Sequence, residues 1–195
     1  MRNMRNMKAM LTGAAVAFAL AAMQCSAHGE VVDQQPNGFS LQEKEQIAAP
    51  PDKVYAALID IGSWWSNAHT MSGDAKNMTL DARAGGCWCE KLPKTGGSVL
   101  HMTVVHADPG DMLRMRGALG PFQATGMEGA MNIVLTPNKQ GTQVQLVYNL
   151  GGYVLGGYQS LPISADGVLG LQLFRLKQLI ETGSANTPRP PEKKP

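Results

Sequence analysis

The sequence predicts an α+β domain in which a curved antiparallel sheet of about seven strands surrounds one long C-terminal helix. Three observations lead to this prediction: an alternating segment that leads into two short helical segments, a run of strand-and-turn segments over 78–150, and a final helical segment over about 164–182. Strands that follow one another without intervening helices favour an antiparallel sheet with its helices on one side.

The N-terminal segment predicts export. Three basic residues lie within the first eight positions, an uncharged run of 15 residues follows over 9–23, and Cys25-Ser26-Ala27 supplies the small residues of a cleavage site. This run is shorter than the roughly 20 residues that span a bilayer, so we expect a signal peptide over 1–27, cleaved near Ala27, and not a retained membrane span. The mature protein is then expected to be periplasmic or secreted.

Polar segments flank the predicted domain. Residues 28–37 lack hydrophobic periodicity, so we expect a flexible lead-in, and the proline- and lysine-rich residues 184–195 are expected to be a disordered tail. Residues 38–183 remain as one domain, large enough to bury a core without disulfides. The formal net charge of +2 comes from the two ends of the chain, which leaves a slightly acidic domain without a basic run. This charge distribution excludes nucleic-acid binding.

The domain begins with a strand and two short helices. Residues 39–48 alternate as a strand does, and Pro50-Pro51-Asp52 begins a helix, because proline suits the first helical turn. After Gly62, a second short helix or turn is expected to contain Trp64 and Trp65. Neighbouring residues on a helix point about 100° apart, so only one tryptophan is expected in the core, and Trp64 is assigned to the ligand site.

Six strand segments follow, separated by turns rich in glycine, proline and asparagine. They cover 78–83, 87–91, 98–106, 112–116, 127–136 and 142–150. The final helix carries leucine and isoleucine at helical spacing on one face and ends at Gly183.

Three stretches of this domain resemble the START-like (SRPBCC) superfamily. IAAPPDKVYAALIDIGSWW (47–65) is similar to its opening strand and paired helices, GGCWCEKLPKTGGSV (85–99) to its next strand pair, and DGVLGLQLFRLKQLIE (166–181) to its closing helix. The resemblance implies the helix-grip fold. Within this superfamily, the chain most resembles the polyketide cyclase/lipid-transport group and the activators of the chaperone ATPase. The second group acts in the cytosol, which disagrees with a signal peptide.

A sheet that grips one helix leaves a cavity, which we expect to hold an apolar small molecule or a lipid. Apolar and polar residues alternate along the later strands, and methionines adapt to irregular ligands. The alternative is that these residues simply form the core. No cofactor is predicted. The expected lining residues are Trp64, Trp88, Met102, Met115, Met131, Leu146, Tyr148, Leu169 and Leu173.

Two glycine-rich segments are predicted to border the cavity. LGGYVLGGYQ (150–159) forms a pliable gate before the final helix, and GALGPF (117–122) forms a second lip. Neither has the Gly-Lys-Ser/Thr ending of a phosphate loop. Gly167 and Gly170, near the start of the final helix, either leave room for a ligand or permit close packing on the sheet.

The sequence offers few catalytic motifs, so an enzyme is not the favoured interpretation. It contains no G-x-S-x-G, H-E-x-x-H or paired C-x-x-C. A cyclase-type enzyme remains an alternative, with Glu90 on the same face as Trp88 as a general base that lacks a recognised partner. His69 is expected in a solvated loop.

Cys87, Cys89 and His101 suggest a thiol, metal or protein-interaction site as a further alternative. If Cys89 pairs with His101 across a hairpin, all three lie on the outer side, and Trp88 and Leu100 face the cavity. Two thiols and an imidazole suit zinc or cuprous ion. Residues two apart in an extended strand lie about 6.5–7 Å apart, so no Cys87–Cys89 disulfide is expected. The simpler interpretation is two half-buried cysteines and a surface histidine. The sequence names no protein partner.

Overall fold

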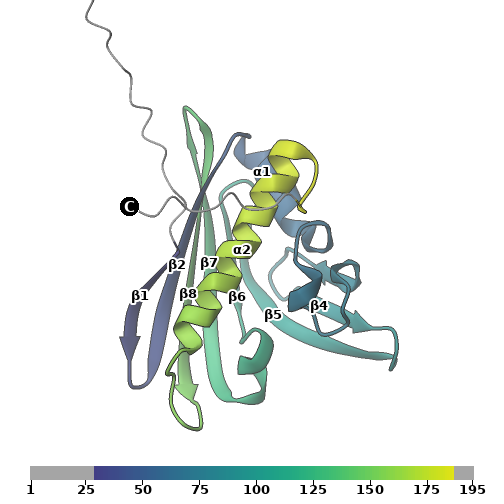
Figure 1. Cartoon of the computed structure of the whole chain (residues 1–195). Coiled ribbons are helices and arrows are strands. Elements are labelled where there is room, and N and C mark those ends of the chain that lie inside the picture. The colour runs from purple at the N-terminus through teal and green to yellow at the C-terminus, as the bar shows by residue number, and fades with distance from the viewer. Residues whose placement is uncertain (1–28, 187–195) are drawn as a thin grey trace, which may run out of the picture.

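Eight antiparallel strands form one curved sheet in the computed structural model, which describes residues 29–186 (Figure 1). The strands are β1 (Glu30–Gln35), β2 (Gly38–Ile47), β3 (Met78–Leu80), β4 (Cys87–Leu92), β5 (Gly97–Asp108), β6 (Met112–Arg116), β7 (Gly126–Asn138) and β8 (Gly141–Tyr153). Their order in the sheet is β1-β2-β8-β7-β6-β5-β4-β3. Because β2 pairs with β8, the first and last parts of the domain lie side by side.

Two α-helices lie on the concave side of this sheet, as Figure 1 shows. They are α1 (Pro51–Ile59) and α2 (Leu161–Thr182). Four short 3-10 helices complete the fold: η1 (Ile61–Ser63), η2 (Asn67–His69), η3 (Ala75–Asn77) and η4 (Gly120–Ala124). This arrangement confirms the predicted α+β helix-grip fold, with eight strands where about seven were expected. None of the helices within residues 29–186 is long and apolar enough to cross a membrane.

Helix α2 packs on the sheet through one apolar face. Leu169, Leu173 and Leu176 are almost fully buried, and Gly183, with a φ of +79°, ends the helix by donating its N–H to the Leu179 carbonyl. A Cβ at Gly170 would lie 3.0 Å from Glu43 Oε2, so this glycine permits close packing on the sheet. Gly167 has open space around it. It is exposed on the outer side of α2, so neither glycine enlarges the ligand cavity.

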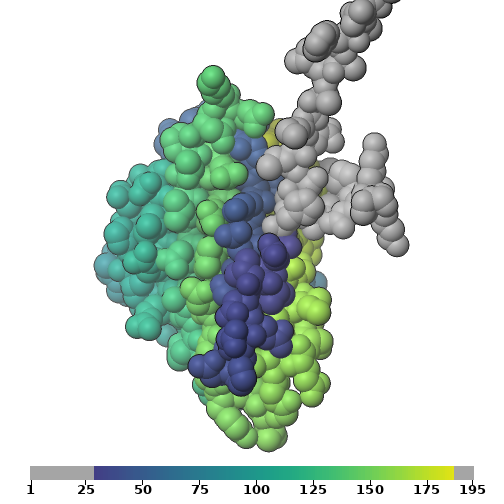
Figure 2. All heavy atoms as spheres, turned by 90° about the vertical axis from the view of Figure 1, so that its left-hand side faces the viewer, coloured from purple at the N-terminus to yellow at the C-terminus, as the bar shows by residue number. Residues whose placement is uncertain are grey.

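The predicted flexible lead-in over 28–37 is wrong for its described part. Residues 30–35 form β1, which pairs with β2 in a hairpin. Figure 2 shows β1, in purple, at the edge of the sheet beside the yellow-green atoms of α2 and the segment before it. A polar edge strand is held by backbone hydrogen bonds, so it leaves no hydrophobic periodicity in the sequence.

The start of the predicted tail also belongs to the fold. Ala185 is 6% exposed and packs on the core, and Asn186 Oδ1 accepts a hydrogen bond from Arg175. The remainder of the predicted tail and the predicted signal peptide lie outside the described residues.

A β-bulge changes the predicted register of β4 and β5. Cys87 pairs with Thr103 as expected, but Cys89 pairs with Leu100, which leaves His101 as the extra residue of β5. His101 is consequently 5% exposed and Leu100 57% exposed, the reverse of the prediction. A shift of one residue moves side chains to the opposite face, so the sequence pattern alone assigned both residues to the wrong side.

The prediction that Cys87 and Cys89 remain unbridged is also wrong. The two cysteines form a disulfide, and their Cα atoms lie 5.5 Å apart, closer than residues i and i+2 of a fully extended strand. This contraction of β4 coincides with the bulge between it and β5. Since His101 faces the interior and both thiols are used, the proposed Cys87/Cys89/His101 metal site does not form. Within residues 29–186, no group of three or more histidine, cysteine or carboxylate side chains could hold a metal ion.

Candidate functional site

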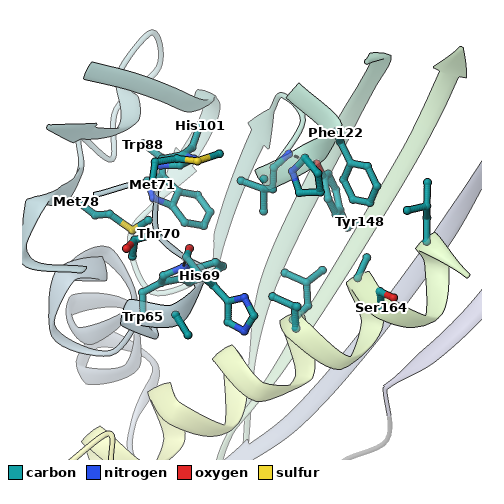
Figure 3. Close-up of a pocket in the computed structure, with 18 residues that line it drawn as sticks. Trp65, His69, Thr70, Met71, Met78, Trp88, His101, Phe122, Tyr148 and Ser164 are labelled. Atoms are coloured by element: carbon teal, nitrogen blue, oxygen red, sulfur yellow. Dashed lines mark hydrogen bonds between the residues drawn. The ribbon is translucent and has the colours of Figure 1, made fainter. Parts of the chain in front are cut away.

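A pocket of about 460 Å³ lies between the first half of α2, the 3-10 helix η4 and residues 65–71 (Figure 3). Strands β3, β4, β5 and β8 each add one side chain to its wall. The lining residues are Trp65, Ala68, His69, Thr70, Met71, Met78, Trp88, His101, Leu119, Gly120, Pro121, Phe122, Tyr148, Leu161, Ser164, Ala165, Val168 and Leu169. Most of these side chains are apolar, and several of them are exposed, so the pocket communicates with solvent.

Three of the predicted lining residues are in this pocket: Trp88, Tyr148 and Leu169. The remaining predicted residues are buried in the core. Five of them instead surround a second, internal cavity of about 10 Å³, which is no larger than one water molecule. These five are Trp64, Met115, Met131, Leu146 and Leu173. Met102 is fully buried and is not among the lining residues of either cavity. Alternation identified the inner face of the sheet correctly, but it did not show where α2 closes on that face.

The tryptophan pair differs from the prediction. Trp64 and Trp65 are both buried, and it is Trp65 that reaches the pocket. Trp64 packs in the core and donates its indole N–H to the Leu58 carbonyl at 3.2 Å.

The segment after the tryptophans forms a wall that sequence patterns did not indicate. Residues 66–71 have no hydrophobic periodicity, and polar contacts hold Ser66 and the preceding Trp64 to α2. Gln172 Oε1 accepts a hydrogen bond from the Ser66 N–H at 2.9 Å, and Arg175 Nε donates to the Trp64 carbonyl at 2.8 Å. His69, predicted to lie in a solvated loop, is exposed but lines the pocket.

The predicted lip over 117–122 does border the pocket. Its position is fixed by Tyr148, whose hydroxyl donates to the Gly117 carbonyl at 2.9 Å and accepts from the Leu119 N–H at 3.1 Å. Burial raises the pKa of Tyr148, so the hydroxyl stays protonated as this donor role requires. A Cβ at Gly117 would lie 2.7 Å from the His101 carbonyl, so the lip approaches β5 directly at the bulge.

The predicted gate over 150–159 lies beside the pocket, whose lining on this side begins at Leu161. Its Tyr158 is buried, and the Tyr158 ring lies 5.5 Å from the Phe39 ring. Phe39 in turn lies 6.0 Å from Phe122 of the lip. This aromatic contact connects the two glycine-rich segments at one end of the pocket.

A buried Glu90–His101 pair is the main polar feature of the site. Glu90 is 1% exposed, and its Oε2 lies 2.8 Å from His101 Nε2. The carboxylate also accepts hydrogen bonds from the backbone N–H groups of Met71 and Ser72. Burial acts to raise the pKa of Glu90, but the hydrogen bonds from Ser72, Met71 and His101 outweigh burial and lower it. Glu90 is therefore an ionised acceptor. The partner that the sequence did not identify is His101, which the bulge turns inward.

His101 is the member of this pair that lines the pocket. Its ring lies 5.7 Å from the Trp88 ring, and Figure 3 shows the two residues together at one end of the pocket, with Ser164 at the other. Since a carboxylate only accepts, Nε2 must donate to Glu90. The arrangement therefore presents one oriented imidazole to an otherwise largely apolar cavity.

An eight-stranded sheet closed by α2 around a pocket defines a helix-grip protein of the START-like (SRPBCC) class. The chain belongs to the family described as polyketide cyclase / dehydrase and lipid transport, whose model matches residues 38–181. A comparison with curated proteins finds no match.

Solved structures with low sequence identity share the fold. The solution structure of the Aha1 dimer from Colwellia psychrerythraea has 17% identity and a TM-score of 0.54, covering 74% of this chain and 97% of that one. CalU16 from Micromonospora echinospora has 13% identity and a TM-score of 0.54, covering 80% and 84%. A protein from Chromobacterium violaceum has 19% identity and a TM-score of 0.52, covering 75% and 99%.

Proposed function

We propose that this protein is an exported carrier that holds an apolar small molecule or a lipid in the pocket beneath α2. The observation that carries the proposal is the pocket itself. Its volume of about 460 Å³ falls within the range of small-molecule sites, and its walls are mostly apolar. The family description, which includes lipid transport, supports the same class of ligand.

The energetics of apolar burial are sufficient for such binding. Removing apolar surface from water contributes roughly 25 cal/mol per Å², so about 300 Å² of ligand surface contributes about 7 kcal/mol before the cost of association. A charged contact is therefore not required.

Filling the pocket tests the carrier function directly. Ala165 lies on the α2 face that lines the pocket, so Ala165→Trp should abolish uptake of an environment-sensitive apolar dye. Ala56→Trp, at an exposed position of α1, is the matched control and should bind the dye as the wild type does. Fatty acids, sterols and aromatic polyketide mimics are then tested for displacement of the dye. Unchanged dye binding by Ala165→Trp, with its fold intact by circular dichroism, would contradict the proposed site.

Export is the second part of the proposal. The basic residues, apolar run and small residues over 1–27 support it, and the Cys87–Cys89 disulfide is consistent with an oxidising compartment. The full-length chain, expressed in a bacterial host, should be recovered outside the cytoplasm and shortened by about 27 residues. Intact mass that shows 1–27 retained on exported protein would refute this part.

The Glu90–His101 pair favours a cyclase-type enzyme as a second candidate. A carboxylate that orients an imidazole toward a bound substrate is a common general-base arrangement, and here His101 would contact the substrate. Turnover that is lost in His101→Gln while dye binding persists would support the enzyme. If the polyketide mimics bind without turnover, the enzyme is contradicted and the carrier function remains.

A further inference from the structure

The polar groups of the pocket wall restrict the chemistry of its ligand. Thr70 Oγ1 donates to the Asn67 carbonyl and accepts from the Gly73 N–H. The Tyr148 hydroxyl is used by the lip, and the Trp65 indole N–H donates to the His69 carbonyl at 2.8 Å. The Trp88 indole N–H has no hydrogen-bond partner among residues 29–186, but this atom is buried and is not open to the pocket. His101 lines the pocket and uses one ring nitrogen, so its second ring nitrogen is left for a ligand.

The contacts of Glu90 decide which nitrogen of His101 carries hydrogen. Glu90 is ionised and accepts from the Met71 and Ser72 N–H groups as well as from the ring. The ring nitrogen that faces it, Nε2, is therefore an N–H donor. In the neutral ring the other nitrogen, Nδ1, then carries a lone pair. Within the described residues, the only hydrogen bond of the His101 ring is the one to Glu90.

We infer that the ligand is a neutral, largely apolar molecule that donates one hydroxyl hydrogen, as a phenol, enol or alcohol, to Nδ1 of His101. The inference rests on the proposed ligand-binding function and names its ligand class. His101 is 5% exposed in an apolar wall, so an acceptor nitrogen on its ring is complementary to a donor, and a ligand without a donor leaves that nitrogen unpaired.

The same geometry disfavours carboxylates. Glu90 places a negative charge 2.8 Å behind the imidazole, and because this carboxylate is 1% exposed, solvent screens it little. Like charges repel more strongly in such surroundings than in water. A fatty acid should therefore bind more weakly than the corresponding alcohol while the ring is neutral.

Three probes of one skeleton test the inference: 1-naphthol, 1-methylnaphthalene and 1-naphthoate. Binding is measured by dye displacement at pH 8. The wild type should bind 1-naphthol about tenfold more tightly than 1-methylnaphthalene, which corresponds to about 1.4 kcal/mol, and should bind 1-naphthoate most weakly.

Two variants and one spectroscopic signal connect this preference to the pair. His101→Phe should lose the naphthol preference, so that 1-naphthol and 1-methylnaphthalene bind this variant with about equal affinity, whatever that affinity is. Glu90→Gln removes the negative charge behind the imidazole. Its amide oxygen, placed at the Oε2 position, still accepts from the Met71 N–H and from His101 Nε2, so the naphthol preference should persist while the naphthoate disadvantage shrinks. In the wild type, naphthol should shift the ¹⁵N resonance of His101 Nδ1.

The outcomes separate the inference from the proposed function. If no probe binds, both fail. If the probes bind without a hydroxyl preference, or if the preference survives in His101→Phe, the ligand class is wrong and the carrier function stands. An unchanged Nδ1 resonance on naphthol binding would overturn the inference even if one variant failed to fold.

Discussion

His101 shows how one backbone irregularity determines the chemistry of a site. Regular pairing of β4 and β5 would direct this ring to the outer face, beside the cysteines. The bulge turns it inward instead, where it meets Glu90. The sequence identified Glu90 as a possible base but could not supply its partner, because a bulge inserts one residue without any distinctive composition. Trp88, Tyr148 and Leu169 were predictable, since regular alternation and helical spacing place them.

Glu90 should make the stability of the protein depend on pH. Its pKa is lower in the folded chain than in the unfolded chain, where it is near 4.3, so unfolding takes up a proton as the pH falls. Its contribution to stability is therefore present above about pH 4.3 and lost as the pH falls through the folded-state pKa. Urea unfolding should show the wild type more stable than Glu90→Gln near pH 7, with a difference that narrows toward pH 3.

The control for this titration is Glu128→Gln, a substitution at an exposed position of β7. Its difference from the wild type should stay small throughout the same pH range. A Glu90→Gln difference that is constant between pH 7 and pH 3 would show that the Glu90 carboxylate does not supply this dependence.

At the scale of elements, the predictable parts were those with a periodic apolar face. The strands over 112–116 and 142–150 and the helix α2 were located nearly as observed. Strand β1 was missed because its polar residues are held by backbone pairing. Residues 66–71 were missed because hydrogen bonds from Ser66 to Gln172 and from Met71 to Glu90 position the segment. The extent of the pocket was not predictable, since it depends on how closely α2 approaches each strand.

The two glycines of α2 allow this approach to be tested. Gly167 has open space around its Cα, so Gly167→Ala should stabilise the protein by about 0.5–1 kcal/mol, the difference in helix propensity. Gly170→Ala has the same propensity gain, but its Cβ would lie 3.0 Å from Glu43 Oε2. Thermal unfolding should therefore show a smaller gain, or a loss, for Gly170→Ala. Equal gains for both variants would mean that α2 does not pack closely on β2 at this point.

At the scale of the whole molecule, the fold follows from the order of its elements, while the ligand site depends on a few local departures from that order. The bulge in β5, the lip held by Tyr148 and the polar segment before η3 each place pocket residues that no periodic pattern marks. The helix-grip arrangement was accordingly predictable, and the Glu90–His101 pair was not. The Cys87–Cys89 disulfide lies on the outer side of the same hairpin.

This disulfide should contribute little to the stability of the domain. A cross-link stabilises mainly by restricting the unfolded chain, and the effect is smallest when the closed loop is short. Cys87 and Cys89 are separated by one residue, so Cys87→Ser/Cys89→Ser should cost at most about 2 kcal/mol, or a fall in Tm of about 8 °C or less. The large core supports the fold without it. The protein purified from an oxidising compartment should show the Cys87–Cys89 bond by non-reducing peptide mapping, and the double variant should still bind the apolar dye. Loss of the cooperative thermal transition in the double variant would show instead that the disulfide is required to hold β4 against the bulge.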